Sequence, residues 1–218
     1  MAELIPIPSP GVPLAYGDLG APIVVVLHDL YGRLPWLEPY AEALANRGGF
    51  RVLVPDFYDG VATTDSEDGR ALMAALTDGA AAGILDSAIE SERGEGDDAQ
   101  RVGLIGFSMG GRIALHAAQE GLADAVVVYY ASLGPGDPGI VPCPVLLHLA
   151  EEDTWAEGAD PETFAARLRD DGTPVVAHTY VGTVHSFANA TLREQVDGRA
   201  AALAFARTTV FLESRLKD

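Results

Sequence analysis

Short apolar runs alternate along this chain with longer segments in which apolar residues recur every three or four positions. The most apolar runs, such as 21–29, have no polar residue at alternate positions, which is typical of strands covered on both faces in a parallel sheet. The longer segments have the periodicity of helices with one buried face. The pattern predicts strands at 21–29, 50–58, 101–107, 123–132, 145–153 and 174–182 and helices at 36–49, 70–93, 109–121, 160–172 and 198–216.

Strands that alternate with helices predict an α/β fold, built on a doubly wound, mostly parallel sheet with helices on both faces. Residues 11–20 contain turn-forming glycines and fit a short hairpin at the edge of that sheet. Residues 59–69 are polar and predict a loop, and Gly79 and Gly83 weaken the middle of the helix that follows. Because no repeat or long linker divides the chain, we expect a single domain over residues 1–218.

The sequence GFSMGG at residues 106–111 lies where a predicted strand gives way to a predicted helix. A turn this tight forces its central residue, Ser108, into a strained backbone conformation, and glycines beside it remove the Cβ atoms that would clash there. The serine hydroxyl is then raised above the carboxyl edge of the sheet, near the N–H groups of the helix N-terminus. This Gly-x-Ser-x-Gly arrangement is typical of the nucleophile elbow of α/β-hydrolases. The alternative is a glycine-rich turn that only packs a helix on a sheet.

A serine hydroxyl is a weak nucleophile that needs a base, and the base needs an acid that orients it. In this fold the three follow one another along the chain as serine, acid and histidine. Asp153 comes at the end of a predicted strand and His185 just after the last one, so we expect both side chains to meet Ser108 at one sheet edge. Glu152 and Glu151 are rival candidates for the acid.

Four other histidines compete with His185 for the role of base: His28, His116, His148 and His178. Two of them lie within predicted strands, one precedes the serine, and one lies in the helix after it, pointing away from the tip of the turn. The negative oxygen that forms during attack on a carbonyl needs two backbone N–H donors. We expect Met109, the residue after the nucleophile, to supply one, and Leu30, in the loop after the first long strand, to supply the other.

The chain resembles the dienelactone hydrolase family of α/β-hydrolases over nearly its whole length. The resemblance is carried by VVVLHDLYG, VLVPDFYDG, RVGLIGFSMGG, VVVYYAS, LAEED and VGTVHSFAN, of which PDFY and HSFA distinguish this family from other esterases. The resemblance implies a catalytic triad of Ser108, Asp153 and His185. It also implies oxyanion donors at Leu30 and Met109.

Three positions depart from the pattern of that family. Its best-known members carry cysteine where this chain has Ser108, and a glutamate that helps to control the thiol where this chain has Asp29. They hold a substrate carboxylate with two arginines; Asn189 stands at the position of one, and Arg70 is a candidate stand-in for the other. An amide cannot neutralise a carboxylate as a guanidinium does. These departures and the acidic composition favour uncharged or weakly polar substrates over a dienelactone.

Several residues at strand ends or in the loops that follow are candidates for the wall of a substrate pocket. Aromatic side chains there offer apolar area with a polar tip, although each of them also fits a packing role in the core. The candidates are Asp29, Tyr31, Trp36, Tyr58, Tyr130 and Asn189.

The composition narrows the partners and the place of action. The chain of 218 residues has a formal net charge of −18, from 32 acidic and 14 basic residues, which disfavours nucleic acid and anionic membrane surfaces as partners. No apolar run is long enough for a membrane span, and we see no signal peptide, so we expect a cytoplasmic protein. The single cysteine, Cys143, excludes an internal disulfide, and no Cys/His cluster predicts a metal site.

We therefore predict a serine hydrolase that cleaves small carboxylic esters or lactones through an acyl-enzyme, without a metal or an organic cofactor. True dienelactone hydrolysis, as by a carboxymethylenebutenolidase, and thioester hydrolysis are alternatives that use the same triad. A non-catalytic module that binds a small molecule is an alternative from another class. The sequence leaves the choice between monomer and homodimer open.

Overall fold

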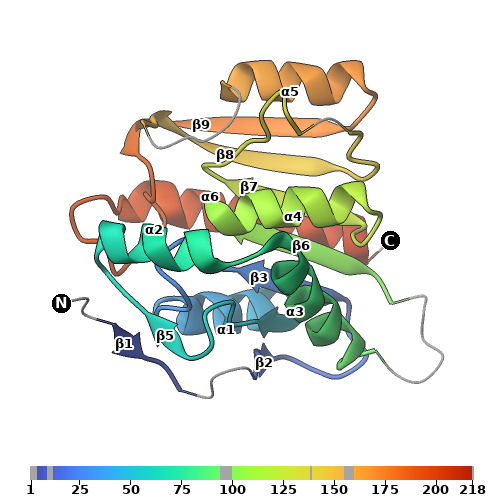
Figure 1. The fold of residues 1–218 in the computed structure, drawn as a ribbon. Coiled ribbons are helices and arrows are strands. Elements are labelled where there is room, and N and C mark those ends of the chain that lie inside the picture. The colour runs from blue at the N-terminus through green and yellow to red at the C-terminus, as the bar shows by residue number, and fades with distance from the viewer. Residues whose placement is uncertain (1–3, 9–11, 94–99, 138, 155–159, 218) are drawn as a thin grey trace.

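The fold is built on one seven-stranded sheet (Figure 1). The computed structural model describes residues 4–8, 12–93, 100–137, 139–154 and 160–217. Across the sheet the strand order is β2-β4-β3-β6-β7-β8-β9, and only β2 runs antiparallel to its neighbour. The strands are β2 Leu14–Tyr16, β3 Ile23–Leu27, β4 Arg51–Val54, β6 Val102–Phe107, β7 Ala125–Tyr129, β8 Val145–Glu152 and β9 Val175–Val184. The predicted α/β fold with a mostly parallel sheet is confirmed.

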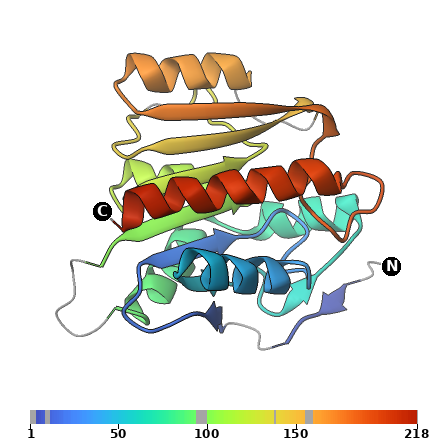
Figure 2. The same cartoon turned by 180° about the vertical axis from the view of Figure 1, so that it is seen from behind.

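Helices cover both faces of the sheet. One face carries α1 and α6, which lie in front of the sheet in Figure 2. The other face carries α2, α3, α4 and α5. Of these, α2, α3 and α4 lie in front of the sheet in Figure 1. The helices are α1 Leu37–Gly48, α2 Ser66–Ala75, α3 Asp78–Glu90, α4 Met109–Gln119, α5 Pro161–Asp170 and α6 Gly198–Leu216.

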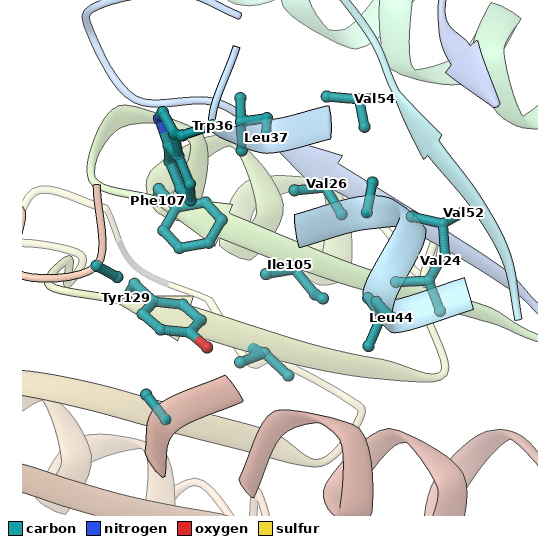
Figure 3. Packing of buried hydrophobic residues seen from close by; sticks show 14 of the residues in the cluster. Val24, Val26, Trp36, Leu37, Leu44, Val52, Val54, Ile105, Phe107 and Tyr129 are labelled. Carbon is teal, nitrogen blue, oxygen red and sulfur yellow. The ribbon is translucent and has the colours of Figure 1, made fainter. Parts of the chain in front are cut away.

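Alternate residues of the central strands point to opposite faces and build two hydrophobic cores. On the face of α1 and α6, Val24 and Val26 of β3 pack with Ile105 and Phe107 of β6 and with Leu44 of α1 (Figure 3). On the other face the intervening strand residues pack against α3, α4 and α5. Both faces of these strands are therefore buried, which is the physical reason for their uninterrupted apolar runs.

Two helices replace the single helix predicted at 70–93, and that prediction is wrong. The first, α2, begins at Ser66, within the segment predicted as a loop, because the side chain of Asp65 accepts hydrogen bonds from two N–H groups of its first turn. The chain leaves the helical conformation at Leu76, and the Thr77 hydroxyl then caps α3. The two helices are bent by 85° to each other.

The segment predicted as a hairpin at 11–20 lies at the sheet edge, but its described residues form one strand, β2, and no hairpin. Strand β2 pairs with β4, so β4 separates it from β3 in the sheet. Two further short strands, β1 Ile5–Pro6 and β5 Val61–Ala62, form a separate antiparallel pair.

Two further observations apply to the described ranges alone. No single helix there has the length and the apolar composition needed to cross a membrane; α2 and α3 meet that requirement only when they are taken together as a bent pair. No group of three or more His, Cys, Asp and Glu side chains in this part of the chain is arranged to hold a metal ion.

The turn between β6 and α4 brings backbone directly against backbone. A Cβ atom at Gly106 would meet the backbone of Gly110, and one at Gly110 would meet the carbonyl oxygens of Leu27 and His28 at the end of β3. Helix α4 therefore begins in contact with the ends of two strands, at positions where no side chain fits. Gly83, in the middle of α3, differs because a Cβ there has nothing within 4 Å.

We expect Gly106→Ala to lower the free energy of unfolding by at least about 3 kcal/mol, because the backbone must move to admit the methyl group. The matched control is Gly83→Ala, which we expect to raise that free energy by about 0.5–1 kcal/mol, since alanine favours a helix interior more than glycine does. Urea unfolding followed by circular dichroism measures both values. Equal effects of the two substitutions would contradict the close packing at the turn.

Candidate active site

The turn after β6 holds Ser108 in a backbone conformation that L-residues rarely adopt, with φ of 50° and ψ of −112°. Its N–H donates to the carbonyl of Tyr129 at the end of β7 (3.0 Å), and its own carbonyl accepts from the N–H of Gly111 in the first turn of α4 (2.9 Å). Such strain costs about 1–3 kcal/mol and persists only where surrounding contacts impose it. Ser108 thus stands at the carboxyl edge of the sheet, beside the point between β3 and β6 where the strand order reverses and where open α/β sheets bind ligands.

Three side chains from distant parts of the chain form a hydrogen-bonded row at this edge. Ser108 Oγ lies 2.8 Å from His185 Nε2, and His185 Nδ1 lies 2.8 and 2.9 Å from the two carboxylate oxygens of Asp153. Asp153 follows β8 and His185 follows β9. With Nδ1–H donating to Asp153, Nε2 is left to accept from the serine hydroxyl. The side chains of His185 and Asp153 are each 8% exposed, so little water competes for the bond between them.

The rival acids are engaged elsewhere or exposed. The carboxylate of Glu151 accepts a hydrogen bond from the N–H of Gly182 in β9 (2.7 Å). Glu152 is exposed at the end of β8. The geometry therefore favours Asp153 over both as the partner of His185.

Two of the competing histidines have both ring nitrogens in other hydrogen bonds. His28 Nδ1–H donates to the carbonyl of Asp29 (2.7 Å), and His28 Nε2 accepts from the N–H of Phe57 (3.1 Å). Burial lowers the pKa of His28 to about 4, so its ring stays neutral. His148 is buried and is hydrogen-bonded to hydroxyl groups of β9 and α6. Neither ring is available to act on Ser108.

A cavity of about 620 Å³ opens beside Ser108 and His185. Leu30 and Met109, the expected oxyanion donors, both line it. Met109 is the first residue of α4, so its N–H has no acceptor within the helix. The serine, the histidine and the two expected donor residues therefore border one space.

Tyr130 lines this cavity, as the sequence predicts for its wall. Its ring centroid lies 4.9 Å from that of His185, its φ is 42°, and its buried hydroxyl has no hydrogen-bond partner among the described residues. The other three aromatic candidates require a correction. Tyr31 and Trp36 are buried in the core on the α1 face. Tyr58 is also buried, and its hydroxyl donates to the sulfur atom of Met109 (3.2 Å).

Asp29 and Asn189, which were also expected at the pocket, are buried against each other instead. Asn189 Nδ2 donates to one carboxylate oxygen of Asp29 (2.8 Å), and the N–H of Tyr31 donates to the other (3.0 Å). Burial raises the pKa of Asp29 to about 6, and these two hydrogen bonds oppose the rise. The pair ties the loop that contains Leu30 to the turn that contains His185.

A model of the dienelactone hydrolase family matches residues 14–216 of the chain. The chain belongs to this family. It is 28% identical to carboxymethylenebutenolidase 1 of Cupriavidus pinatubonensis over 211 residues, which cover 91% of this chain and 88% of that protein. It is 24% identical to the protein usf of Aquifex pyrophilus over 208 residues, which cover 90% of each chain. The crystal structure of the dienelactone hydrolase-like promiscuous phosphotriesterase P91, from metagenomic libraries, has the same fold, with a TM-score of 0.73, 23% identity and coverage of 91% of this chain and 88% of the other.

Within the dienelactone hydrolase family, this chain departs from the expected pattern at Asp29 and Asn189 together. The shorter carboxylate and the amide bond to each other in the interior, at 1% and 0% exposure. Asn189 is therefore no anchor for a substrate carboxylate in the cavity. Arg70, the candidate stand-in for the second arginine, does line the cavity, from α2.

Reasoning from the sequence missed most of the cavity wall, including two basic residues of α4, Arg112 and His116. The prediction that His116 points away from the site is wrong, because its side chain borders the cavity. Arg112 and His116 lie four residues apart in α4, which places both on one face of that helix. That spacing is the signal in the sequence that identifies them.

We expect the buried carboxyl of Asp29 to make stability depend on pH in a defined direction. Its pKa of about 6 in the folded protein exceeds its ordinary value of 3.8, so the folded state binds this proton more tightly than the unfolded state does. The resulting contribution to the free energy of unfolding is full below pH 3.8 and is lost as the pH rises through 6. The difference in that free energy between wild type and Asp29→Asn, from urea unfolding, should therefore fall between these pH values and stay level above them. A difference that does not vary with pH would contradict the raised pKa.

Proposed function

We propose that this member of the dienelactone hydrolase family is a serine hydrolase of small carboxylic esters or lactones. The observation that carries the proposal is the row Ser108–His185–Asp153 at the wall of the 620 Å³ cavity. Family membership supports hydrolysis of an ester or a lactone as the type of reaction. The names of two relatives, a carboxymethylenebutenolidase and a promiscuous phosphotriesterase, also belong to hydrolases.

In the first half of the reaction, Ser108 Oγ attacks the carbonyl carbon while its proton passes to His185 Nε2. The Asp153 carboxylate holds Nδ1–H and stabilises the imidazolium that forms. The carbonyl oxygen becomes negative and accepts hydrogen bonds from the N–H groups of Leu30 and Met109. The bond to the alcohol oxygen then breaks, His185 returns its proton to that oxygen, and the acyl group remains on Ser108.

In the second half, a water molecule attacks the acyl carbon and gives a proton to His185 Nε2. The same two N–H groups hold the second oxyanion. The bond to Ser108 then breaks, and the proton on His185 restores the serine hydroxyl as the acid leaves. No step requires a metal ion or an organic cofactor. In a lactone the alcohol remains attached to the acyl group until this second release.

Carboxymethylenebutenolidase activity is the second candidate, because a relative covering most of the chain has that name. A dienelactone carries a carboxylate that needs a cation in the cavity. Asn189 is buried away from the wall, so Arg70 is the side chain of the expected pair that is placed to meet this carboxylate.

Three broader expectations stay predictions from the sequence: a cytoplasmic location, a single domain and a monomeric or homodimeric state.

We expect Ser108→Ala to lower kcat/KM for p-nitrophenyl esters of short acids by at least about three orders of magnitude, because the nucleophile is lost. A dienelactone is assayed in parallel. A kcat/KM for the dienelactone above that for the esters favours carboxymethylenebutenolidase activity, and a lower value favours the general esterase. A covalent serine-hydrolase probe should label the wild type and not the variant. Activity that survives Ser108→Ala would refute the proposal, and a wild type inert on all substrates would favour a binding module.

We expect Asp153→Asn to lower kcat/KM for the same esters by about 10³–10⁴, because an amide at this position favours the wrong imidazole tautomer. The matched control is Glu152→Gln, which removes the neighbouring charge and should change kcat/KM by less than about threefold. Thermal melts of both variants report whether each remains folded. Similar losses in the two variants would mean that Asp153 is not the orienting acid.

A further inference from the structure

Helix α2 packs against the loop that contains Leu30, and it does so at a glycine. Of the ten residues of α2, Gly69 alone is buried. A Cβ atom at Gly69 would overlap Cδ1 of Leu30 and would lie 3.0 Å from the carbonyl oxygen of the same residue. The helix can therefore approach Leu30 this closely only because position 69 has no side chain.

Hydrogen bonds hold the residues on either side of Leu30. The carbonyl of Tyr31 accepts from the N–H of Thr63, in the segment that joins β5 to α2 (2.9 Å). The carboxylate of Asp29 accepts from the N–H of Tyr31 (3.0 Å) and from the side chain of Asn189 (2.8 Å). These bonds fix the loop before and after Leu30, and α2 covers Leu30 itself.

The backbone of Leu30 supplies an unpaired donor next to the candidate nucleophile. Leu30 is buried and lines the cavity beside Ser108. Its N–H has no hydrogen-bond acceptor within the described part of the chain. Buried N–H groups are rarely left without an acceptor. This donor is one that the proposed reaction needs for the oxyanion, and its effect depends on the exact position of the peptide.

We propose that Gly69 is a positioning residue for this donor: α2 packs on Leu30 at the position without a side chain and holds its peptide where the oxyanion forms. The inference rests on the proposed function and adds a residue that is not among the described residues of the cavity wall. Groups that stabilise a transition state must stay within about 0.5 Å of their productive position. A methyl group at position 69 either displaces Leu30 or lifts α2 off it, and both remove the contact that fixes the peptide.

The first test is Gly69→Ala, assayed with p-nitrophenyl butyrate. We expect kcat to fall by about tenfold or more and KM to change by less than about threefold, because the donor acts on the transition state. The matched control is Gly83→Ala in α3, the same substitution where a Cβ atom has nothing within 4 Å. This control should keep the wild-type kcat and KM.

A trifluoromethyl ketone with the acyl chain of the ester gives a second readout. Ser108 Oγ adds to its carbonyl carbon, the serine proton passes to His185, and the carbonyl oxygen keeps the electron pair of the broken π bond as an oxyanion. In Gly69→Ala its inhibition constant should rise by about the factor by which kcat/KM falls, since both depend on the oxyanion donors. Partial unfolding would instead lower kcat without raising the inhibition constant, because the folded molecules would bind the ketone as before.

The contact itself is tested in a Leu30→Ala background, which removes Cδ1 and keeps the backbone N–H. There the added methyl group has room, so Gly69→Ala should lower kcat by less than about threefold. This double variant also provides a folded protein for comparison if the overlap in Gly69→Ala weakens the fold. Equal losses in the two backgrounds would mean that the two residues do not act on each other.

Four results would overturn the positioning role: a kcat in Gly69→Ala within twofold of the wild type, a change confined to KM, an unchanged inhibition constant, or equal losses in the two backgrounds. The proposed hydrolase then still stands, because the wild type cleaves the ester. If the wild type cleaves no ester, the proposed function fails and this inference fails with it. The wild-type assay thus separates the two failures.

Discussion

The close approach of α4 to the ends of β3 and β6 is the constraint on which the candidate site depends. It exists because Gly106 and Gly110 have no Cβ atoms, which would otherwise enter the backbone of the neighbouring turn and strand. Once α4 begins there, the chain turns within one residue, and Ser108 takes the strained angles that this requires. The same contact places Met109 at the cavity. Backbone packing therefore sets the position of the candidate nucleophile and of one expected oxyanion donor together.

Behind this turn, a buried polar network joins the elements that carry the rest of the site. The Tyr129 hydroxyl in β7 is hydrogen-bonded to Thr208 of α6 (2.8 Å), and Thr208 is bonded to His148 of β8 (3.0 Å). On its other side His148 is bonded to the Tyr180 hydroxyl of β9 (2.8 Å). Buried polar groups that satisfy one another rigidify the structure around them. The network thus fixes β8 and β9 relative to β7, and the ends of β8 and β9 lead directly to the candidate acid and base.

The sequence predicts the sheet and the members of the hydrogen-bonded row because both depend on local patterns. Uninterrupted apolar runs indicate strands buried on two faces, and Gly-x-Ser-x-Gly at a strand–helix junction indicates the turn. The sequence does not predict the break between α2 and α3, because the break depends on a single cap at Thr77. Gly79 and Gly83, which were expected to weaken the helix, lie after that cap and inside α3. The bond between Asp29 and Asn189 joins residues 160 positions apart, so no local pattern predicts it. The predictions of Tyr31, Trp36 and Tyr58 at the cavity wall were wrong for the same reason, since tertiary packing decides which aromatic side chains reach the cavity.

The charge of this protein illustrates why net charge is a weak guide to a substrate. Charges on the surface of the chain are screened over about 8–10 Å at physiological ionic strength, so most of the excess negative charge acts weakly inside the cavity. A cation in the cavity wall acts at short range in a medium of lower dielectric constant, and its interaction with a bound anion is correspondingly stronger. The side chains that line the cavity therefore matter more for a bound molecule than the net charge of −18 does. An acidic surface that favours solubility therefore says little about the charge of the molecule that the cavity binds.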